Sequence, residues 1–245
     1  MIPRFFCPFP LHPGATVNLP DEAAHHALRV LRVDAGDTAV LFDGSGGHWQ
    51  ATLHPAGKAV RAVLHEFIAD DREPPLDITL AQCLPAADKM DYVVQKAVEL
   101  GVRQIQPVAA KRSVIRLSGE RMERRVTHWQ AIAIAACEQS GRNVVPHVAP
   151  ILDLPQYLAM ARAQNQARWL CLPEVAEAGK RLRDQTAPDT AVTLLIGPEA
   201  GFEEGEVKAC LAAGFTAVRL GPRVLRTETA GPAAIAALLA LWGDI

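Results

Sequence analysis

The sequence predicts an α/β protein in two parts, a small β-rich part and a larger part built on a parallel sheet. Strand-like runs and glycine-rich turns fill about the first seventy of the 245 residues. The charged, proline-containing stretch DDREPP at residues 70–75 interrupts this pattern, because proline continues neither a helix nor a central strand. Beyond it, apolar strand-like runs alternate with helix-length segments, which is typical of a parallel sheet with helices on both faces. We therefore expect two domains, residues 1–72 and 73–245.

The first domain contains short strands and one helix. RFF at residues 4–6 forms a strand, and residues 37–54 read as a hairpin around the turn DGSGG at residues 43–47. Residues 58–67 form a further strand, and DEAAHHALRVLR at residues 21–32 forms the helix. This pattern indicates a small sheet with a single helix packed on it.

The second domain repeats strand and helix. The first strand, LDITLAQCL, is followed by the helical segment DKMDYVVQKAVELG, in which apolar residues recur at i, i+3, i+4, i+7 and i+8. The remaining strands are expected at residues 103–110, 167–173, 191–197 and 215–221, and the remaining helices at residues 120–141 and near the chain end. The order predicts a sheet whose carboxyl-terminal edge binds the ligand.

Composition excludes several classes of protein. The net charge of -2 gives no global nucleic-acid signal, but residues 103–125 hold seven basic and two acidic residues, either a phosphate-binding face or a solvated one. The five cysteines form no CxxC pair and no zinc-like cluster with histidine, so we expect no metal. The N-terminus lacks an apolar signal region, and the longest apolar run, at residues 233–242, is too short to span a bilayer. We expect a cytoplasmic protein without a membrane partner.

Two Gly-Pro loops mark the predicted ligand site. TLLIGPEAGF and VRLGPRVLRT each place a Gly-Pro pair directly after a strand. Glycine lets the backbone approach a ligand closely, and proline fixes the chain behind it. One such pair is an ordinary turn, whereas two pairs at two strand ends favour a cradle for a small ligand. No GxGxxG or GxxxxGK[ST] motif is present, which disfavours a nucleotide-dependent enzyme such as a dehydrogenase.

These loops carry a resemblance to a known family. LIGPEAGFEEGEV together with LGPRVLRTETA resembles the cofactor-binding motifs of the SPOUT class of RNA methyltransferases, and within it the RsmE family. The stretches DKMDYVVQKAVELGV, RSV, CEQSGRNVVP, RFF, HHALRVLRVDAGD and LFDGSG are also similar to that family and stand in its order. The resemblance therefore covers both predicted domains.

The resemblance implies a fold, a reaction and partners. It implies an α/β domain with a C-terminal trefoil knot, preceded by a small PUA-like β-barrel that helps to bind RNA. It implies methylation of N3 of a uridine in 16S ribosomal RNA of the small subunit, S-adenosylmethionine as cofactor, and a homodimer. This sequence departs from the family at Ala200 and at Gly231-Pro232, and the second departure favours a last helix that starts at Pro232. The alternative is a non-catalytic RNA-binding ribosome-assembly factor on the same scaffold. The intact GPEAG and RVLRTETA loops disfavour this alternative.

The resemblance also implies site residues. The predicted cofactor-binding residues are Leu195, Ile196, Gly197, Pro198, Glu199, Gly201, Leu220, Gly221, Val224, Leu225, Arg226, Thr227 and Thr229. Arg226 and Arg142 are the candidates for stabilising an anionic uracil, and Glu228 either orients an arginine or accepts the N3 proton. The candidates for RNA phosphate contacts are Arg4, Arg32, Lys111, Arg112 and Arg116.

Overall fold

The computed structural model describes residues 2–86, 88–113, 119–161, 166–173 and 180–245 of the chain. It divides into two compact units. The first contains Met1–Glu73 together with Ile134–Val145, and the second contains Pro74–Ala133 together with Pro146–Ile245. The segment Ile134–Val145, which the sequence assigns to the second domain, thus packs with the first unit.

The first unit is a five-stranded sheet with one short helix. Its strands are β1 (Arg4–Phe6), β2 (Thr16–Asn18), β3 (Thr38–Phe42), β4 (His48–Ala56) and β5 (Ala59–Ile68), in the order β1-β3-β4-β5-β2. Only the pair β1 and β3 of this sheet is parallel. Helix α1 (Asp21–His26) continues as a π-helical turn, η1 (Ala27–Leu31), and ends at Arg32, whose φ of 56° is left-handed. The predicted small sheet domain is confirmed.

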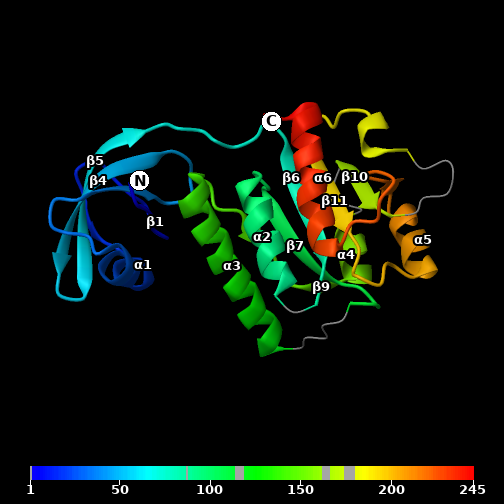
Figure 1. Cartoon of the computed structure of the whole chain (residues 1–245), viewed down its shortest axis with the longest axis horizontal. Coiled ribbons are helices and arrows are strands. Elements are labelled where there is room, and N and C mark those ends of the chain that lie inside the picture. Colours follow the sequence, from blue (N-terminus) through cyan, green and yellow to red (C-terminus); the bar gives the residue numbers. More distant parts are fainter. Residues whose placement is uncertain (1, 87, 114–118, 162–165, 174–179) are drawn as a thin grey trace. The chain divides into compact units, whose positions relative to one another are not determined.

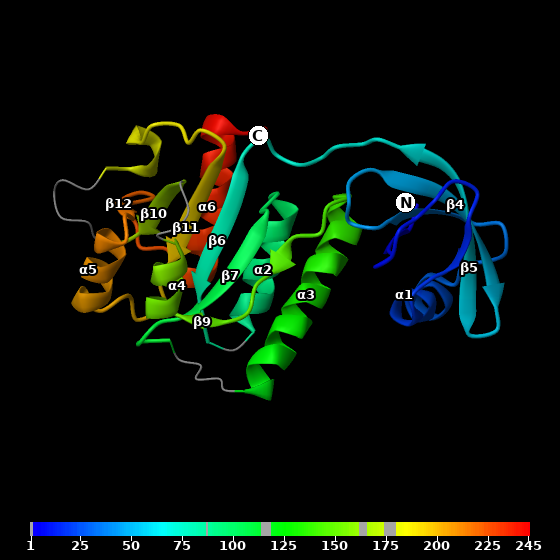
Figure 2. The same cartoon turned by 180° about the vertical axis from the view of Figure 1, so that it is seen from behind.

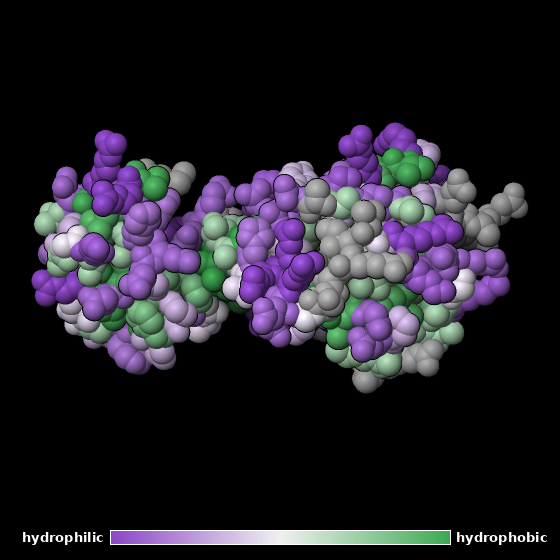
Figure 3. All heavy atoms as spheres, turned by 90° about the horizontal axis from the view of Figure 1, so that it is seen from below, coloured by the Kyte–Doolittle hydropathy of each residue, from purple (hydrophilic) through white to green (hydrophobic). Residues whose placement is uncertain are grey.

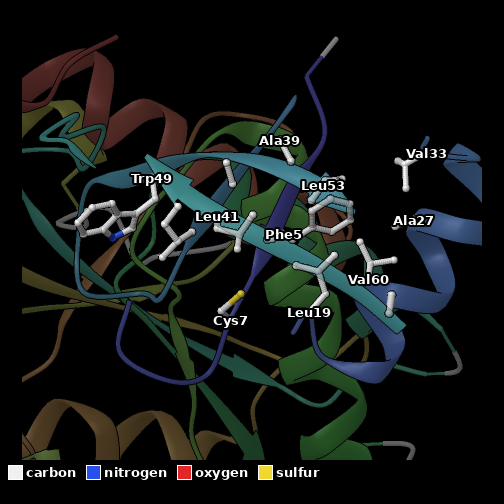
Figure 4. Packing of buried hydrophobic residues seen from close by; sticks show 14 of the residues in the cluster. Phe5, Cys7, Leu19, Ala27, Val33, Ala39, Leu41, Trp49, Leu53 and Val60 are labelled. Carbon is white, nitrogen blue, oxygen red and sulfur yellow. The ribbon is translucent and has the colours of Figure 1, made fainter. Parts of the chain in front are cut away.

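The core of this unit lies on one face of the sheet. Phe5, Leu41 and Leu53 are at most 1 % exposed, and Figure 4 shows them packed together with Val60 and Leu19. Burial alternates along β5, as expected for a sheet with one buried face.

Arg4 joins strand β1 to the segment after helix α3. Its Nη2 donates hydrogen bonds to the carbonyl oxygens of Gly141 (3.1 Å) and Arg142 (3.3 Å) and to Oδ1 of Asn143 (2.5 Å). Its guanidinium carbon lies 5.2 Å from the ring centroid of Phe42. Burial lowers the pKa of Arg4. These contacts give Arg4 a structural role within the first unit, while its predicted contact with RNA stays a prediction.

Arg4→Met is expected to destabilise the first unit by about 2–3 kcal/mol, because charge-assisted hydrogen bonds to buried groups are lost. Amide hydrogen exchange of strands β1 and β3 measures this change. Arg61→Met is the matched control, since Arg61 lies on β5 and is exposed. Equal exchange rates in the two variants would contradict the structural role of Arg4.

The second unit is built on a parallel sheet of seven strands. They are β6 (Asp77–Cys83), β7 (Gln104–Ala109), β8 (His147–Val148), β9 (Leu152–Asp153), β10 (Ala167–Cys171), β11 (Ala191–Ile196) and β12 (Thr216–Val218). The order is β12-β10-β11-β6-β7-β8, and β9 also pairs with β7. The predicted parallel-sheet domain is confirmed, whereas the trefoil knot stays a prediction.

Helices cover both faces of this sheet. They are α2 (Lys89–Glu99), α3 (Glu120–Ser140), α4 (Leu154–Ala161), α5 (Glu204–Ala212) and α6 (Thr227–Trp242), with a short 3-10 turn, η2 (Leu182–Asp184). Figures 1 and 2 show α2 and α6 on one face and α4 and α5 on the other. Ala81 and Cys83 of β6 belong to the same apolar cluster as Tyr157 of α4 and Cys210 of α5. The intervening Gln82 contacts α6 instead, because side chains alternate along a strand.

Helix α6 begins at Thr227, so the expectation that it starts at Pro232 is wrong. The backbone N–H groups of Thr229 and Ala230 both donate to the carbonyl oxygen of Arg226, which closes the first turn before the proline is reached. Pro232 lies inside the helix and leaves one backbone acceptor of the preceding turn without its usual donor. Gly231 permits close packing, because a Cβ atom there would lie 3.1 Å from Oε1 of Gln82.

Hydrophilic residues cover most of the molecular face drawn in Figure 3, and hydrophobic residues appear among them in smaller groups. Among the described helices, none has the length and apolar character needed to cross a membrane.

Candidate active site

A cavity of about 640 Å³ lies at the carboxyl-terminal ends of β10, β11 and β12. These strands are neighbours, with β10 in the middle, so their three following loops meet at one edge of the sheet. The predicted cofactor residues that line the cavity are Ile196, Gly197, Pro198, Glu199, Gly201, Leu220, Gly221, Val224, Leu225, Arg226 and Thr227. Both Gly-Pro loops therefore border one space.

Four of the predicted cofactor-binding and catalytic residues lie elsewhere. Leu195 is fully buried in the cluster shared with α4 and α5, on the face of the sheet away from α6, and Thr229 is exposed. Arg142 is 3 % exposed within the first unit, where its Nε donates to Oε1 of Glu73 at 3.0 Å and its Nη2 also pairs with Glu73. Glu228 lies beside the cavity-lining Lys89 without itself lining the cavity. The catalytic role of Arg142 stays a prediction.

Sequence reasoning missed several residues that line the cavity. Cys171 is the last residue of strand β10, and Leu172 and Pro173 follow it. Lys89 is the first residue of helix α2. The end of β10 carries no Gly-Pro pair, so it lacks a signal comparable with the other two loops. Its position between β11 and β12 is a property of the strand order, which local sequence does not reveal.

A hydrogen-bond chain joins strand β6 and helix α6 to the first Gly-Pro loop. Nε2 of Gln82 donates to Oγ1 of Thr227 at 2.9 Å, and Oγ1 of Thr227 donates to the carbonyl oxygen of Gly197 at 2.6 Å. Because the hydroxyl has one proton, accepting from Gln82 directs that proton to Gly197. The chain fixes the first Gly-Pro loop relative to the first residue of α6.

The second Gly-Pro loop offers free backbone groups. Among the described residues, the backbone groups of residues 220–225 make no backbone hydrogen bond with the rest of the chain. Arg226 is the N-cap residue of α6, and its exposed side chain lines the cavity. Backbone groups without partners at a ligand cavity are available to a ligand.

The two glycines differ in the space around them. A Cβ atom at Gly197 would lie 2.9 Å from the ring of Phe202, which also lines the cavity. A Cβ atom at Gly221 would meet no described protein atom within 4 Å. A larger side chain at Gly197 would therefore push on the protein, whereas one at Gly221 would project into open space.

The predicted RNA residues occupy different surroundings. Lys111 is exposed and its Nζ lies 3.1 Å from Oε2 of Glu203, the N-cap residue of α5. Arg112 donates from Nη1 to the carbonyl oxygen of Ala200 at 3.2 Å, inside the first Gly-Pro loop. Arg32 is exposed, and Arg116 lies outside the described residues. Arg112 is thus a partner of the cofactor loop as well as a candidate for RNA.

No group of three or more histidine, cysteine, aspartate or glutamate side chains suited to a metal is found within the described part of the chain. The five cysteines are free and buried. Burial raises the pKa of Cys171, which lines the cavity, to about 12 and so keeps its thiol protonated at neutral pH.

The fold and the cavity are those of an RNA methyltransferase. Residues 72–239 match the RNA methyltransferase domain family, and residues 19–63 match the RNA methyltransferase PUA domain family. The chain belongs to the ribosomal RNA small subunit methyltransferase E family, which the sequence resemblance had indicated as RsmE.

Individual relatives agree along nearly the whole chain. Ribosomal RNA small subunit methyltransferase E of Synechocystis is 33% identical over 229 residues, which is 93% of this chain and 74% of the relative. The crystal structure of the Neisseria gonorrhoeae enzyme of the same name, bound to S-adenosyl methionine, is 42% identical with a TM-score of 0.90 and full coverage of both chains. A structure from Legionella pneumophila with bound cofactor SAM is 34% identical with a TM-score of 0.94, again covering 100% of each chain.

Proposed function

We propose that the protein transfers a methyl group from S-adenosylmethionine to N3 of a uridine in 16S ribosomal RNA, acting on the small ribosomal subunit in the cytoplasm. The observation that carries this proposal is the cavity at the ends of β10, β11 and β12, bordered by both Gly-Pro loops. Two structures of similar chains with bound S-adenosylmethionine support the choice of cofactor.

The residues around the cavity suit such a cofactor. Ile196, Leu220 and Leu225 supply apolar walls for an adenine ring. The backbone of residues 220–225, which makes no backbone hydrogen bond with another described residue, supplies donors and acceptors for its edge. Gly221 leaves room for a close approach of the ligand to the backbone. Glu199 lines the same space, and its carboxylate is paired with the ammonium of Lys89.

The chain must bind uracil and remove its N3 proton, because neutral uracil carries a hydrogen on that nitrogen. When bound, S-adenosylmethionine would supply a methyl group attached to a positively charged sulfur. The sulfur would keep the electron pair of the carbon–sulfur bond as the methyl group passes to N3. The proton of N3 passes to a carboxylate oxygen of Glu228. Arg226 donates hydrogen bonds to the uracil carbonyl oxygens, where the negative charge of the deprotonated base resides.

A methyl-transfer assay with small ribosomal subunits that lack the modification tests the proposed function. The expected result is incorporation of labelled methyl from S-adenosylmethionine into 16S ribosomal RNA, with the product identified as N3-methyluridine by mass spectrometry of the nucleosides. Binding of S-adenosylmethionine without any methyl transfer to RNA would favour the alternative of a non-catalytic assembly factor. Absence of cofactor binding in calorimetry would overturn the assignment of the cavity.

The RNA-binding residues are proposed to act through phosphate contacts. Replacing Lys111 by Ala and Arg32 by Gly together is expected to flatten the dependence of log K on log salt by roughly two units, one for each lost phosphate contact. Glycine at position 32 also accepts the left-handed backbone without strain. Filter binding at several salt concentrations measures the slope. Arg183→Ala is the control, because Arg183 is also an exposed arginine. An unchanged slope in the double variant would show that neither Lys111 nor Arg32 contacts an RNA phosphate.

We also propose that the protein is a homodimer through helix α6. One face of α6 is buried, whereas Ala233, Ala236 and Ala237 are half-buried and Leu241 is 42% exposed. This second apolar face is the kind of surface that a partner subunit covers.

Leu241→Asp is expected to convert the dimer to a monomer, because a carboxylate buried at an apolar interface lacks a partner. Light scattering at micromolar concentration measures the mass. Leu211→Asp is the matched control, since Leu211 of α5 is 45% exposed and lies on another helix. A monomeric wild-type protein would contradict the proposed assembly.

A further inference from the structure

Lys89 connects two carboxylates from distant parts of the second unit. Its Nζ lies 3.2 Å from Oε1 of Glu199, in the loop after β11, and 3.5 Å from Oε2 of Glu228, in the first turn of α6. Lys89 is itself the first residue of α2 and lines the cavity. One ammonium group therefore joins three segments that surround the same space.

The two carboxylates depend on Lys89 to different degrees. Oε1 of Glu199 also accepts a hydrogen bond from the backbone N–H of Ala86 at 2.8 Å. Partial burial acts to raise the pKa of Glu199, but the hydrogen bonds from Ala86 and Lys89 outweigh it, and the pKa lies below its usual value. Glu199 would thus keep a partner if the ammonium were removed.

Glu228 has no comparable support. Its Oε2 is shielded from solvent and accepts no hydrogen bond among the described residues. Within that part of the chain, the salt bridge that Glu228 makes is the one to Lys89. The position of this shielded oxygen is therefore fixed by its ion pair with Lys89, because no hydrogen-bond donor among the described residues holds it.

We propose that Lys89 is a positioning residue for methyl transfer, which holds the carboxylate of Glu228 in a fixed place beside the cavity. The inference rests on the proposed function, in which Glu228 accepts the N3 proton. Lys89 neither gains nor loses a proton in that step: the proton leaves N3 and bonds to a carboxylate oxygen of Glu228, while the electron pair of the N–H bond stays on the nitrogen.

A double-mutant cycle separates this role from that of an ordinary surface ion pair, which contributes little. The variants are Lys89→Met, Lys89→Arg, Glu228→Gln and the combination of Lys89→Met with Glu228→Gln. The matched control is Lys96→Met, because Lys96 lies on the same helix and pairs with Glu99 at 2.8 Å but does not line the cavity. The single-turnover rate of methyl transfer is measured at saturating S-adenosylmethionine, and cofactor affinity is measured separately by calorimetry.

Lys89→Met is expected to lower the single-turnover rate by about 100-fold, the lower end of what a positioned proton acceptor contributes. Lys89→Arg restores most of that rate, because it keeps the positive charge, and Lys96→Met leaves the rate unchanged. The double variant is no slower than Glu228→Gln alone, since Lys89 acts through Glu228. Cofactor affinity in Lys89→Met changes by less than about tenfold, because Glu199 retains Ala86.

Three results would overturn the inference: multiplicative rate losses in the double variant, equal rates for Lys89→Met and Lys96→Met, or no recovery in Lys89→Arg. Failure of the proposed function is seen separately, as absence of cofactor binding or of methyl transfer in the wild-type protein.

Discussion

Arg226→Ala is expected to lower the rate of methyl transfer by about 10²–10³-fold, the usual effect of removing one preorganised donor from a developing anion. The side chain of Arg226 lines the cavity and makes no salt bridge with a described residue, so its donors are available to the substrate. Single-turnover transfer to small ribosomal subunits at saturating cofactor measures the effect.

Stability should change little in this variant. Arg226 caps α6 through its backbone, whose carbonyl oxygen accepts from Thr229 and Ala230, and its side chain makes no capping hydrogen bond. Alanine keeps that backbone. Arg183→Ala, which removes an exposed arginine from η2, is the control for a general loss of charge. A wild-type rate for Arg226→Ala would exclude the guanidinium from stabilising the uracil anion.

Gly221→Val is expected to weaken S-adenosylmethionine binding by roughly 10- to 100-fold, which corresponds to about 1–3 kcal/mol of steric overlap with the ligand. The fold should be unaffected, since a Cβ atom at this position meets no described protein atom within 4 Å. Calorimetry measures the affinity, and a thermal melt of the unliganded protein checks the fold.

Two further glycine substitutions serve as a control and a comparison for Gly221→Val. Gly205→Val is the matched control, because Gly205 lies on α5, is exposed and also has no neighbouring atom within 4 Å of its Cβ position. Gly197→Val is expected to weaken binding and also to lower the melting temperature, because its Cβ atom would lie 2.9 Å from the ring of Phe202. Normal cofactor affinity in Gly221→Val would show that the second Gly-Pro loop does not border the bound ligand.

Much of the candidate site could be predicted from the sequence, because local chemistry marks it. Gly197, Pro198 and Gly221 of the two Gly-Pro pairs line the cavity, after the strands that the sequence predicted. The adjacent Arg226 and Thr227 also line it. The same motif also predicts Leu195, but the alternation of side chains along β11 directs it into the core.

Residues that act from a distance in sequence could not be found in this way. Gln82 reads as one polar residue in a buried strand, and its bond to Thr227 spans 145 positions in the chain. Lys89 reads as an ordinary charged residue at the start of a helix, and its partner Glu199 is 110 positions away. The sequence predicts an RNA contact for Arg4, whereas in the structure its Nη2 donates to the segment after α3, which packs with the first unit.

The sequence by itself determined the local elements of this protein, since hydrophobic periodicity, glycine and proline act within a few residues. It also determined the family, through the two loops and their order. Only the tertiary structure decided that β10 lies between β11 and β12, so that residues 171–173 complete the cavity, and that Lys89 joins Glu199 to Glu228. The physical reason is that strand order and side-chain pairing in the second unit follow from packing all of its segments together, and no short stretch of sequence contains that information.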